Sequence, residues 1–225
     1  MSEPSAPAAL TRDQARELDR KAIQELGIPS VVLMELAGLA VARAAEHLAG
    51  GEGPVLVVAG PGNNGGDGYV AARHLANRGV QTAVLVFAAE AQIAGDAKVN
   101  LDILLRMGVP VRFLAAPIAW DLYREHLRLA SAVVDALFGT GLRGEVREPG
   151  RTAIELLNQA RKPAVAVDIP SGLDCDTGRP LGIAVQAAVT VTFARAKVGL
   201  LRPEAAAYVG RLVVADIGIP PSLSP

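Results

Sequence analysis

The sequence predicts an α/β fold: a three-layer α/β/α, Rossmann-like domain with a mostly parallel, doubly wound sheet and two extra N-terminal helices. Three observations predict it. Short Val-rich apolar runs recur along the chain, helical patterns separate most of them, and a glycine-rich loop follows the first run. Strands that alternate with helices are joined by right-handed crossovers, and helices cover both faces of the resulting parallel sheet.

The chain is long enough for one sizeable core, since it has 225 residues of which 51% are hydrophobic. We therefore expect a single domain over residues 11–225. Residues 1–10 are rich in Pro, Ser and Ala, which is typical of a disordered tail.

Two helices are predicted before the first strand. Thr11 and Gln14 form a capping-box pattern that opens a helix ending near Leu26. The next helix, residues 30–49, is apolar almost all round, so it needs a cover. It either forms a subunit interface or a lid, or it buries both sides within the monomer.

The rest of the chain alternates strands and helices. The predicted strands span residues 55–59, 81–87, 110–114, 131–137, 164–168, 188–194 and 211–216. The predicted helices between them span residues 67–78, 95–107, 118–129 and 150–161, and a long loop covers 169–186. Ligands bind outside the carboxyl ends of such strands, so the loops that follow them are expected to line one pocket.

Composition argues against several classes of protein. The 22 basic and 23 acidic residues are interspersed, which disfavours nucleic acid as a partner. The single cysteine, Cys175, allows no intramolecular disulfide and fits a reducing cytoplasm, and the three histidines lack the spacing of a zinc site. Neither a signal peptide nor a membrane span is visible, so we expect a soluble, cytoplasmic protein.

The first glycine-rich loop is the most informative stretch. The glycine spacing of residues 60–65 matches the dinucleotide fingerprint, and a helix start there would aim backbone N–H groups at a phosphate. Asn63, Asn64 and Asp67 add polar groups suited to a ligand or ion. The alternative is a tight turn in which the glycines merely allow positive φ.

Two later strands also end in chemically useful residues. Asp135 precedes a second glycine-rich loop whose amides, with Arg143, suit a phosphate; the alternative is a solvated turn. Asp168 directly follows an apolar run, where burial would raise the carboxyl pKa and suit a general acid/base; the alternative is an Asp that bonds the following turn. Asp174 and Asp176 are interpreted mainly as turn-forming residues.

Three of these strand-end residues suggest a cation site. Asn64, Asp135 and Ser171 belong to different loops that would face the same pocket. One amide, one carboxylate and one hydroxyl form an all-oxygen site of low charge, which suits a hard, weakly charged cation better than zinc. We infer a monovalent ion.

The segments GPGNNGGDGYVAARHL, DALFGTGL, DIPSGLDCDTG and TVTFARAKVGL, in this order, resemble the YjeF N-terminal domain family, the NAD(P)H-hydrate epimerases. The segment MELAG, Met34–Gly38, matches as well, and the resemblance spans about residues 11–221. It implies a Rossmann-like, usually dimeric enzyme that interconverts the R and S forms of nicotinamide cofactors hydrated at C6. The S form would pass to a dehydratase, expected on a separate chain because this one ends at DIGIPPSLSP.

The resemblance also implies the site residues. One potassium ion per subunit would bind Asn64, Asp135 and Ser171, and NADHX or NADPHX is the substrate rather than a cofactor. The hydrate-binding positions would be Asn63, Asn64, Gly65, Gly66, Asp67, Gly139, Thr140, Gly141, Leu142, Arg143, Gly144, Glu145 and Asp168. Asp168 is the first candidate to move the proton and Asp67 the second, unless Asp67 only caps its helix. Lys197 either neutralises a cofactor phosphate or is a surface lysine.

Two other functions share parts of this pattern. A non-catalytic Rossmann-like module that binds nucleotides, or acts as a protein or RNA scaffold, would be expected to lack the pocket acids and to carry a basic surface, and this sequence shows neither. An NAD(P)-dependent dehydrogenase would need a proton donor such as a Tyr-Lys pair, and the three tyrosines have no such context.

Overall fold

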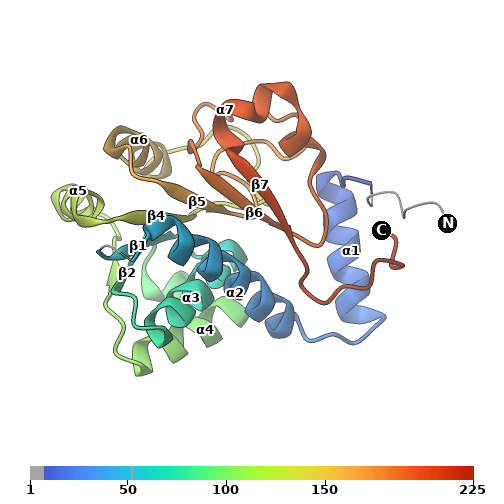
Figure 1. Cartoon of the computed structure of the whole chain (residues 1–225), viewed down its shortest axis with the longest axis horizontal. Helices are drawn as coiled ribbons and strands as arrows, with labels where there is room; N and C mark the ends of the chain where they lie inside the picture. Colours follow the sequence, from blue (N-terminus) through green and yellow to red (C-terminus); the bar gives the residue numbers. More distant parts are fainter. Residues whose placement is uncertain (1–7, 52) are drawn as a thin grey trace.

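The computed structural model describes residues 8–51 and 53–225, and it confirms the predicted fold class. One parallel sheet of seven strands, in the order β3-β2-β1-β4-β5-β6-β7, lies between two helical layers (Figure 1). The strands are β1 (Val55–Ala59), β2 (Thr82–Val86), β3 (Val111–Phe113), β4 (Ala132–Ala136), β5 (Ala164–Val167), β6 (Val189–Phe193) and β7 (Arg211–Ala215). The helices are α1 (Arg12–Gln24), α2 (Ser30–Ala49), α3 (Asn63–Asn77), α4 (Gly95–Arg106), α5 (Trp120–Leu129), α6 (Gly150–Ala160) and α7 (Ala206–Val209).

The direction in which strands are added reverses beside β1. From β1 the chain builds outward to β2 and β3, crosses back through α5, and places β4 on the other side of β1, with Ala59 opposite Ala136. The loops after β1 and β4 therefore lead away in opposite directions, and a ligand can enter the crevice between them. Every residue of β1 is buried, because alternate side chains enter the cores on the two faces of the sheet.

The two helical layers follow from the crossovers. Helices α2, α3 and α4 cover one face, and α5, α6 and α7 cover the other (Figure 1). The apolar helix α2 packs on α3 and on the sheet, with Leu33 and Val41 buried, so the alternative that buries this helix within the monomer is correct for most of its surface. Among the helices described, none is both long and apolar enough to cross a lipid bilayer.

Helix α3 begins at Asn63, one turn before the predicted start near Asp67. Asn and Gly have low helix propensity, which is why the sequence pattern placed them in a loop. Tertiary contacts explain the glycines. A Cβ at Gly65 would lie 2.0 Å from the carbonyl oxygen of Gly60, and a Cβ at Gly66 would lie 2.7 Å from the Met34 sulfur. The first turn of α3 therefore fits against the loop and α2 only without side chains at these positions.

The N-terminal segment is tied to the far end of the sheet. The predicted tail falls outside the described residues as far as residue 7, but Leu10 is buried and bonds the segment after β6 through its N–H, 2.8 Å from the Ala196 oxygen. The guanidinium of Arg12 donates to Asp174 at 2.7 Å, and the Arg12 N–H donates to Asp176 at 2.7 Å. The two acidic residues interpreted as turn-forming therefore also hold α1 over the carboxyl edge, and Asp174 still accepts the Thr177 N–H of its own turn at 2.8 Å.

The crossing of α2 and α3 leads to a first prediction. A Cβ at Gly38 would lie 2.4 Å from the Cβ of Val70 and 2.7 Å from the Asp67 oxygen. Gly38→Ala is therefore expected to lower the free energy of unfolding by about 1–3 kcal/mol, measured by urea denaturation. Gly141→Ala is the matched control, since its added methyl group meets nothing within 4 Å. Equal stability losses in both variants would contradict close helix packing.

Candidate functional site

A cavity of about 220 Å³ lies at the carboxyl edge of the sheet, between the strand-end loops and helices α1 and α2. The side chains at its centre come from elements far apart in the sequence, as the crossovers require. Those with polar groups are Asp19, Ser30, Asn63, Asp67, Asp96, Thr140, Asp168 and Lys197. The loops that follow β1, β4, β5 and β6 thus all contribute residues to one cavity, as predicted.

Asp168 is held by an ion pair with Lys197. The Lys197 ammonium lies 2.5 Å from Asp168 Oδ1, and the Thr192 hydroxyl donates to the same oxygen at 2.9 Å. Both bonds fall on Oδ1, so Oδ2 has no hydrogen-bond partner within residues 8–51 and 53–225 and is available to the cavity. Lys197 is only 4% exposed, so the expectation of a surface lysine is wrong, and its charge is directed at a carboxylate.

The backbone helps to aim Asp168. Its φ of 63° is in the left-handed region, which most residues with side chains avoid. This conformation turns the chain sharply after β5, and the Asp168 N–H still pairs with the Val191 oxygen at 2.8 Å. The carboxylate is bonded to β6 and Lys197 rather than to the turn that follows it, which was the alternative from sequence.

Asp67 is the second carboxyl group of the cavity and is of a different character. It is the fifth residue of α3, so it does not cap that helix, whose N-cap is Gly62. Its side chain is 9% exposed. Burial raises the pKa of the Asp67 carboxyl well above its ordinary value, and the charges of Asp168 and Asp19 raise it further while Lys197 opposes them. The surroundings of Asp67 therefore disfavour its charged form.

Asp19 is a cavity residue that sequence reasoning did not single out. It lies at the cavity wall on α1, in contact with solvent. The surrounding protein raises its pKa to about 6, an effect that the charge of Lys197 opposes and that of Asp168 increases. No motif marked it, because one acidic residue on an amphipathic helix looks like part of a solvated face. Only the anchoring of α1 brings it to the cavity.

Asp135 and Ser171 form a buried pair beneath the cavity. The Ser171 N–H donates to Asp135 Oδ2 at 2.8 Å, and the Ser171 hydroxyl donates to Oδ1 at 2.6 Å. The Phe138 N–H donates to the same hydroxyl at 2.8 Å. Burial raises the pKa of Asp135 to about 6, although the bonds from Ser171 and Leu137 favour the charged form.

Asn64 joins this pair through the second glycine-rich loop. A Cβ at Gly139 would lie 3.0 Å from Asn64 Oδ1, and Gly139 follows the Phe138 that bonds Ser171. The buried Asn64 Nδ2 has no hydrogen-bond partner in the described part of the chain. As an N–H donor it suits an acceptor atom of a ligand, whereas a cation would need Asn64 Oδ1. The predicted amide, carboxylate and hydroxyl therefore surround one short stretch of backbone. Their oxygen donors fit a hard cation of low charge.

Other metals fit less well. Within the described residues no three or more His, Cys, Asp or Glu side chains gather in a way that could hold a metal ion. A transition metal such as zinc would need nitrogen or sulfur ligands, which the Asn64, Asp135 and Ser171 group does not offer. The free Cys175 is buried elsewhere, against the Arg12 guanidinium.

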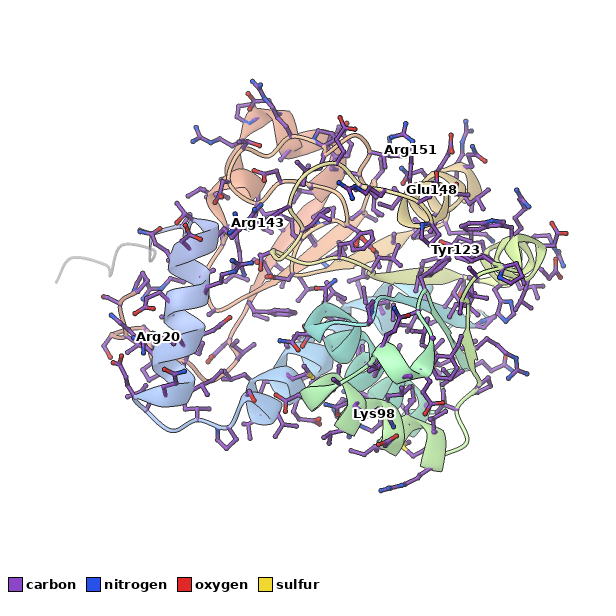
Figure 2. All side chains as sticks on the ribbon, turned by 180° about the vertical axis from the view of Figure 1, so that it is seen from behind. Arg20, Lys98, Tyr123, Arg143, Glu148 and Arg151 are labelled. Carbon is purple, nitrogen blue, oxygen red and sulfur yellow. The ribbon has the colours of Figure 1, made fainter. Side chains whose placement is uncertain are left out.

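Some of the remaining predicted binding residues line the cavity and others do not. Thr140 lines the cavity, whereas Arg143, Gly144 and Glu145 are exposed on the same loop, where Figure 2 labels Arg143. Leu142 packs against the core beneath α5 and α6. In the first loop, Asn63 and Asp67 reach the cavity, while the intervening glycines allow close backbone contact instead.

Comparison with known proteins supports a family assignment. Residues 30–199 match the family described as "YjeF-related protein N-terminus". The chain is 45% identical, over 95% of its own length, to the "Bifunctional NAD(P)H-hydrate repair enzyme Nnr" of Moorella thermoacetica, of which it covers 41%. It is 40% identical to the "NAD(P)H-hydrate epimerase" of Limosilactobacillus fermentum, over 92% of this chain and 96% of that protein.

A solved structure agrees with these sequence matches. The crystal structure of the yeast protein ynu0 superposes with a TM-score of 0.78 at 27% identity, covering 97% of this chain and 95% of that one. The chain thus spans about two fifths of the bifunctional Moorella relative and nearly all of the Limosilactobacillus epimerase. By sequence and by fold, the chain belongs to the family of YjeF-related protein N-termini.

Proposed function

We propose that this protein is an NAD(P)H-hydrate epimerase, an isomerase that interconverts the R and S forms of NADHX and NADPHX. One observation carries the proposal: two carboxyl groups in different surroundings face one cavity, Asp168 in an ion pair and Asp67 buried with a raised pKa. The similarity to a protein named as this epimerase over 96% of that protein's length supports it. Pairs of acids whose environments differ in this way commonly divide the roles of proton donor and acceptor.

The chemistry needs one donor and one acceptor. Protonation of the C6 hydroxyl lets the C–O bond break, water leaves, and the ring nitrogen stabilises the resulting cation. Water then adds to the other face of C6 and loses a proton, so that the epimer forms with no net oxidation or reduction. We assign the proton donor to Asp67 and the acceptor to Asp168, which Lys197 and Thr192 hold in place. In the reverse direction the same steps run backwards.

The two glycine-rich loops would hold the rest of the substrate. The N-terminus of α3 directs backbone N–H groups into the crevice beside exposed Asn63, an arrangement that suits a pyrophosphate. The loop of residues 139–145 would provide further backbone N–H groups, and Arg143 is the positively charged residue of this loop. These assignments complete the predicted binding set, of which Asn63, Asp67, Thr140 and Asp168 line the cavity.

A potassium ion would occupy the group of Asn64, Asp135 and Ser171, one ion in each subunit. The potassium ion would act as a fixed positive charge that orients the oxygen atoms bound to it. The three residues would link the loops after β1, β4 and β5, which are the loops that shape the cavity. The buried carboxylate of Asp135 and the Asn64 side-chain oxygen beside Gly139 support this assignment.

The proposed partners are a second copy of this chain and a dehydratase that consumes the S form. Relatives differ in how the two activities are arranged, since one is named as bifunctional and another as the epimerase. A homodimer is supported by exposed apolar side chains where α1 passes into α2, which include Leu26 and Val32, 49% and 44% exposed.

The catalytic assignment predicts the effect of two substitutions. Asp168→Asn and Asp67→Asn are each expected to lower kcat for R-to-S interconversion about 10²–10⁴-fold, because one removes the acceptor and the other the donor. NMR or chiral chromatography of the NADHX epimers, corrected for spontaneous conversion, measures the rate. Asp121→Asn, on the exposed face of α5, is the matched control and should match the wild type.

The pH profile provides an independent check. Because the pKa of Asp67 is raised, the fall in rate with rising pH, which comes from deprotonation of the donor, should occur at a higher pH than for an ordinary Asp and should be absent from the residual rate of Asp67→Asn. Wild-type kcat and substrate affinity in Asp168→Asn would rule out its role as acceptor. Substrate binding without interconversion above the spontaneous rate would favour the non-catalytic nucleotide-binding or scaffold module.

The cation site predicts a dependence on potassium. Potassium should raise the melting temperature of the wild type relative to N-methylglucamine, because it binds only the folded site. Ser171→Ala removes a ligand and is expected to raise the half-saturating potassium concentration about tenfold or more. Ser131→Ala, at the other end of β4, is the control and should respond as the wild type does. No stabilisation of the wild type by potassium would exclude the site.

The proposed homodimer predicts a particle in solution with twice the mass of one chain. Sedimentation velocity should give a dimer for the wild type and a shift toward monomer for Leu26→Glu, which puts a charge on the apolar junction. Leu129→Glu changes a side chain of similar exposure, 52%, at the end of α5 and should leave the dimer intact. A monomeric wild type at micromolar concentration would contradict the assignment.

A further inference from the structure

A second concave surface lies apart from the catalytic cavity and shares no lining residue with it. It is a groove of about 600 Å³ at the carboxyl ends of β2 and β3, bordered by the starts of α5 and α6. Its apolar wall contains aromatic side chains and its rim carries polar ones. The residues that matter here are Phe87, Gln92, Trp120, Glu148 and Thr152.

One wall of the groove lies next to the start of the first glycine-rich loop. The Phe87 N–H donates to the Ala59 oxygen at 2.8 Å, and Ala59 immediately precedes that loop. The other end of the same loop, at Asn63, lines the catalytic cavity. The N-terminus of α3 therefore lies between the two hollows. The cavity reaches Asp168 after β5, Phe193 of β6 and Asp96 of α4, and the groove lies at the ends of β2 and β3.

We infer that this groove binds the adenine and its ribose in the dinucleotide substrate; the inference rests on the proposed epimerase function. A dinucleotide lies across the switch point of a doubly wound sheet with its pyrophosphate at the helix that follows β1. When the reactive ring is in the cavity beside Asp67 and Asp168, the other nucleoside extends from the pyrophosphate in the opposite direction. That direction leads to the groove.

The chemistry of the groove suits a neutral, planar base. Trp120 is half-buried, and its ring centroid lies 5.9 Å from that of Phe87. Phe87 is fixed in turn by an edge-on contact with the buried Tyr123, at 5.1 Å between centroids. One face of this aromatic group is thus rigid, which favours stacking on a base.

The polar rim of the groove offers hydrogen-bond partners for a nucleoside. Glu148 is exposed at the start of α6, on the side of the molecule where Figure 2 also labels Tyr123. A carboxylate there accepts hydrogen bonds from ribose hydroxyls or an exocyclic amine. Gln92 and Thr152 supply further donors and acceptors at the rim.

The test uses the fact that Trp120 is the only tryptophan of the chain. Its fluorescence reports directly on the groove, without any substitution. Titration with AMP is expected to quench or shift the emission, whereas nicotinamide mononucleotide, which lacks adenine, should leave it unchanged. The AMP signal should persist in saturating nicotinamide mononucleotide. An AMP signal that this compound displaces, or no AMP signal at all, would overturn the inference.

Substitutions provide a second measurement. Trp120→Leu is expected to raise KM for NADHX about tenfold with kcat nearly unchanged, because stacking on adenine binds ground and transition states equally. Trp120→Phe keeps a stacking surface and should restore most of the affinity. Leu129→Ala, on the exposed end of the same helix, is the matched control. Unchanged KM in Trp120→Leu, with circular dichroism confirming the fold, would contradict the inference.

The outcomes separate the inference from the proposed function. Normal epimerisation with no AMP signal and no effect of Trp120→Leu would remove the adenine site and leave the epimerase. An AMP signal in a protein that does not interconvert the epimers would keep the adenine site and remove the epimerase. Asp168→Asn should keep the wild-type AMP signal, because Asp168 lies in the catalytic cavity and not in the groove.

Discussion

The buried ion pair between Lys197 and Asp168 is the interaction on which the rest of the site depends. Two opposite charges removed from water are tolerated only when they are close and further hydrogen-bonded, and Thr192 completes that requirement. The pair links the end of β5 to the segment after β6. The negative charge of Asp168 inside the cavity also raises the pKa of Asp67. One interaction thus fixes the geometry of Asp168 and contributes to the raised pKa of Asp67.

The same pair connects the N-terminal segment to the chemistry. Leu10 bonds the backbone on either side of Lys197, at Ala196 and Val198, and Arg12 is anchored on the loop that follows β5. Helix α1 is thereby fixed over the carboxyl edge of the sheet, where it brings Asp19 to the cavity. Removing the anchors would open one wall of the cavity without touching any group assigned to the reaction.

Close backbone packing is the second constraint on the site. The first turn of α3 fits against Gly60 and Met34 only because its glycines carry no side chain, and Gly139 makes room for Asn64 in the same way. The loops after β1, β4 and β5 meet around Asp135 and Ser171. The Asp135 carboxylate, one of the oxygen donors of the proposed cation site, is fully buried there. The position of α3 would then determine where the pyrophosphate of the proposed substrate lies, with a hollow on either side.

The sequence by itself determined the sheet, its seven strands, the strand-end loops and the group of Asn64, Asp135 and Ser171, because apolar periodicity and loop chemistry are local properties. It did not determine the start of α3, the burial of Lys197, or the presence of Asp19 and Trp120 beside hollows at the edge of the sheet. Those features depend on contacts between segments far apart in the chain. Low helix propensity at Asn63 is overridden by packing against α2, and a lysine that reads as a surface residue is buried because a carboxylate on another strand compensates its charge.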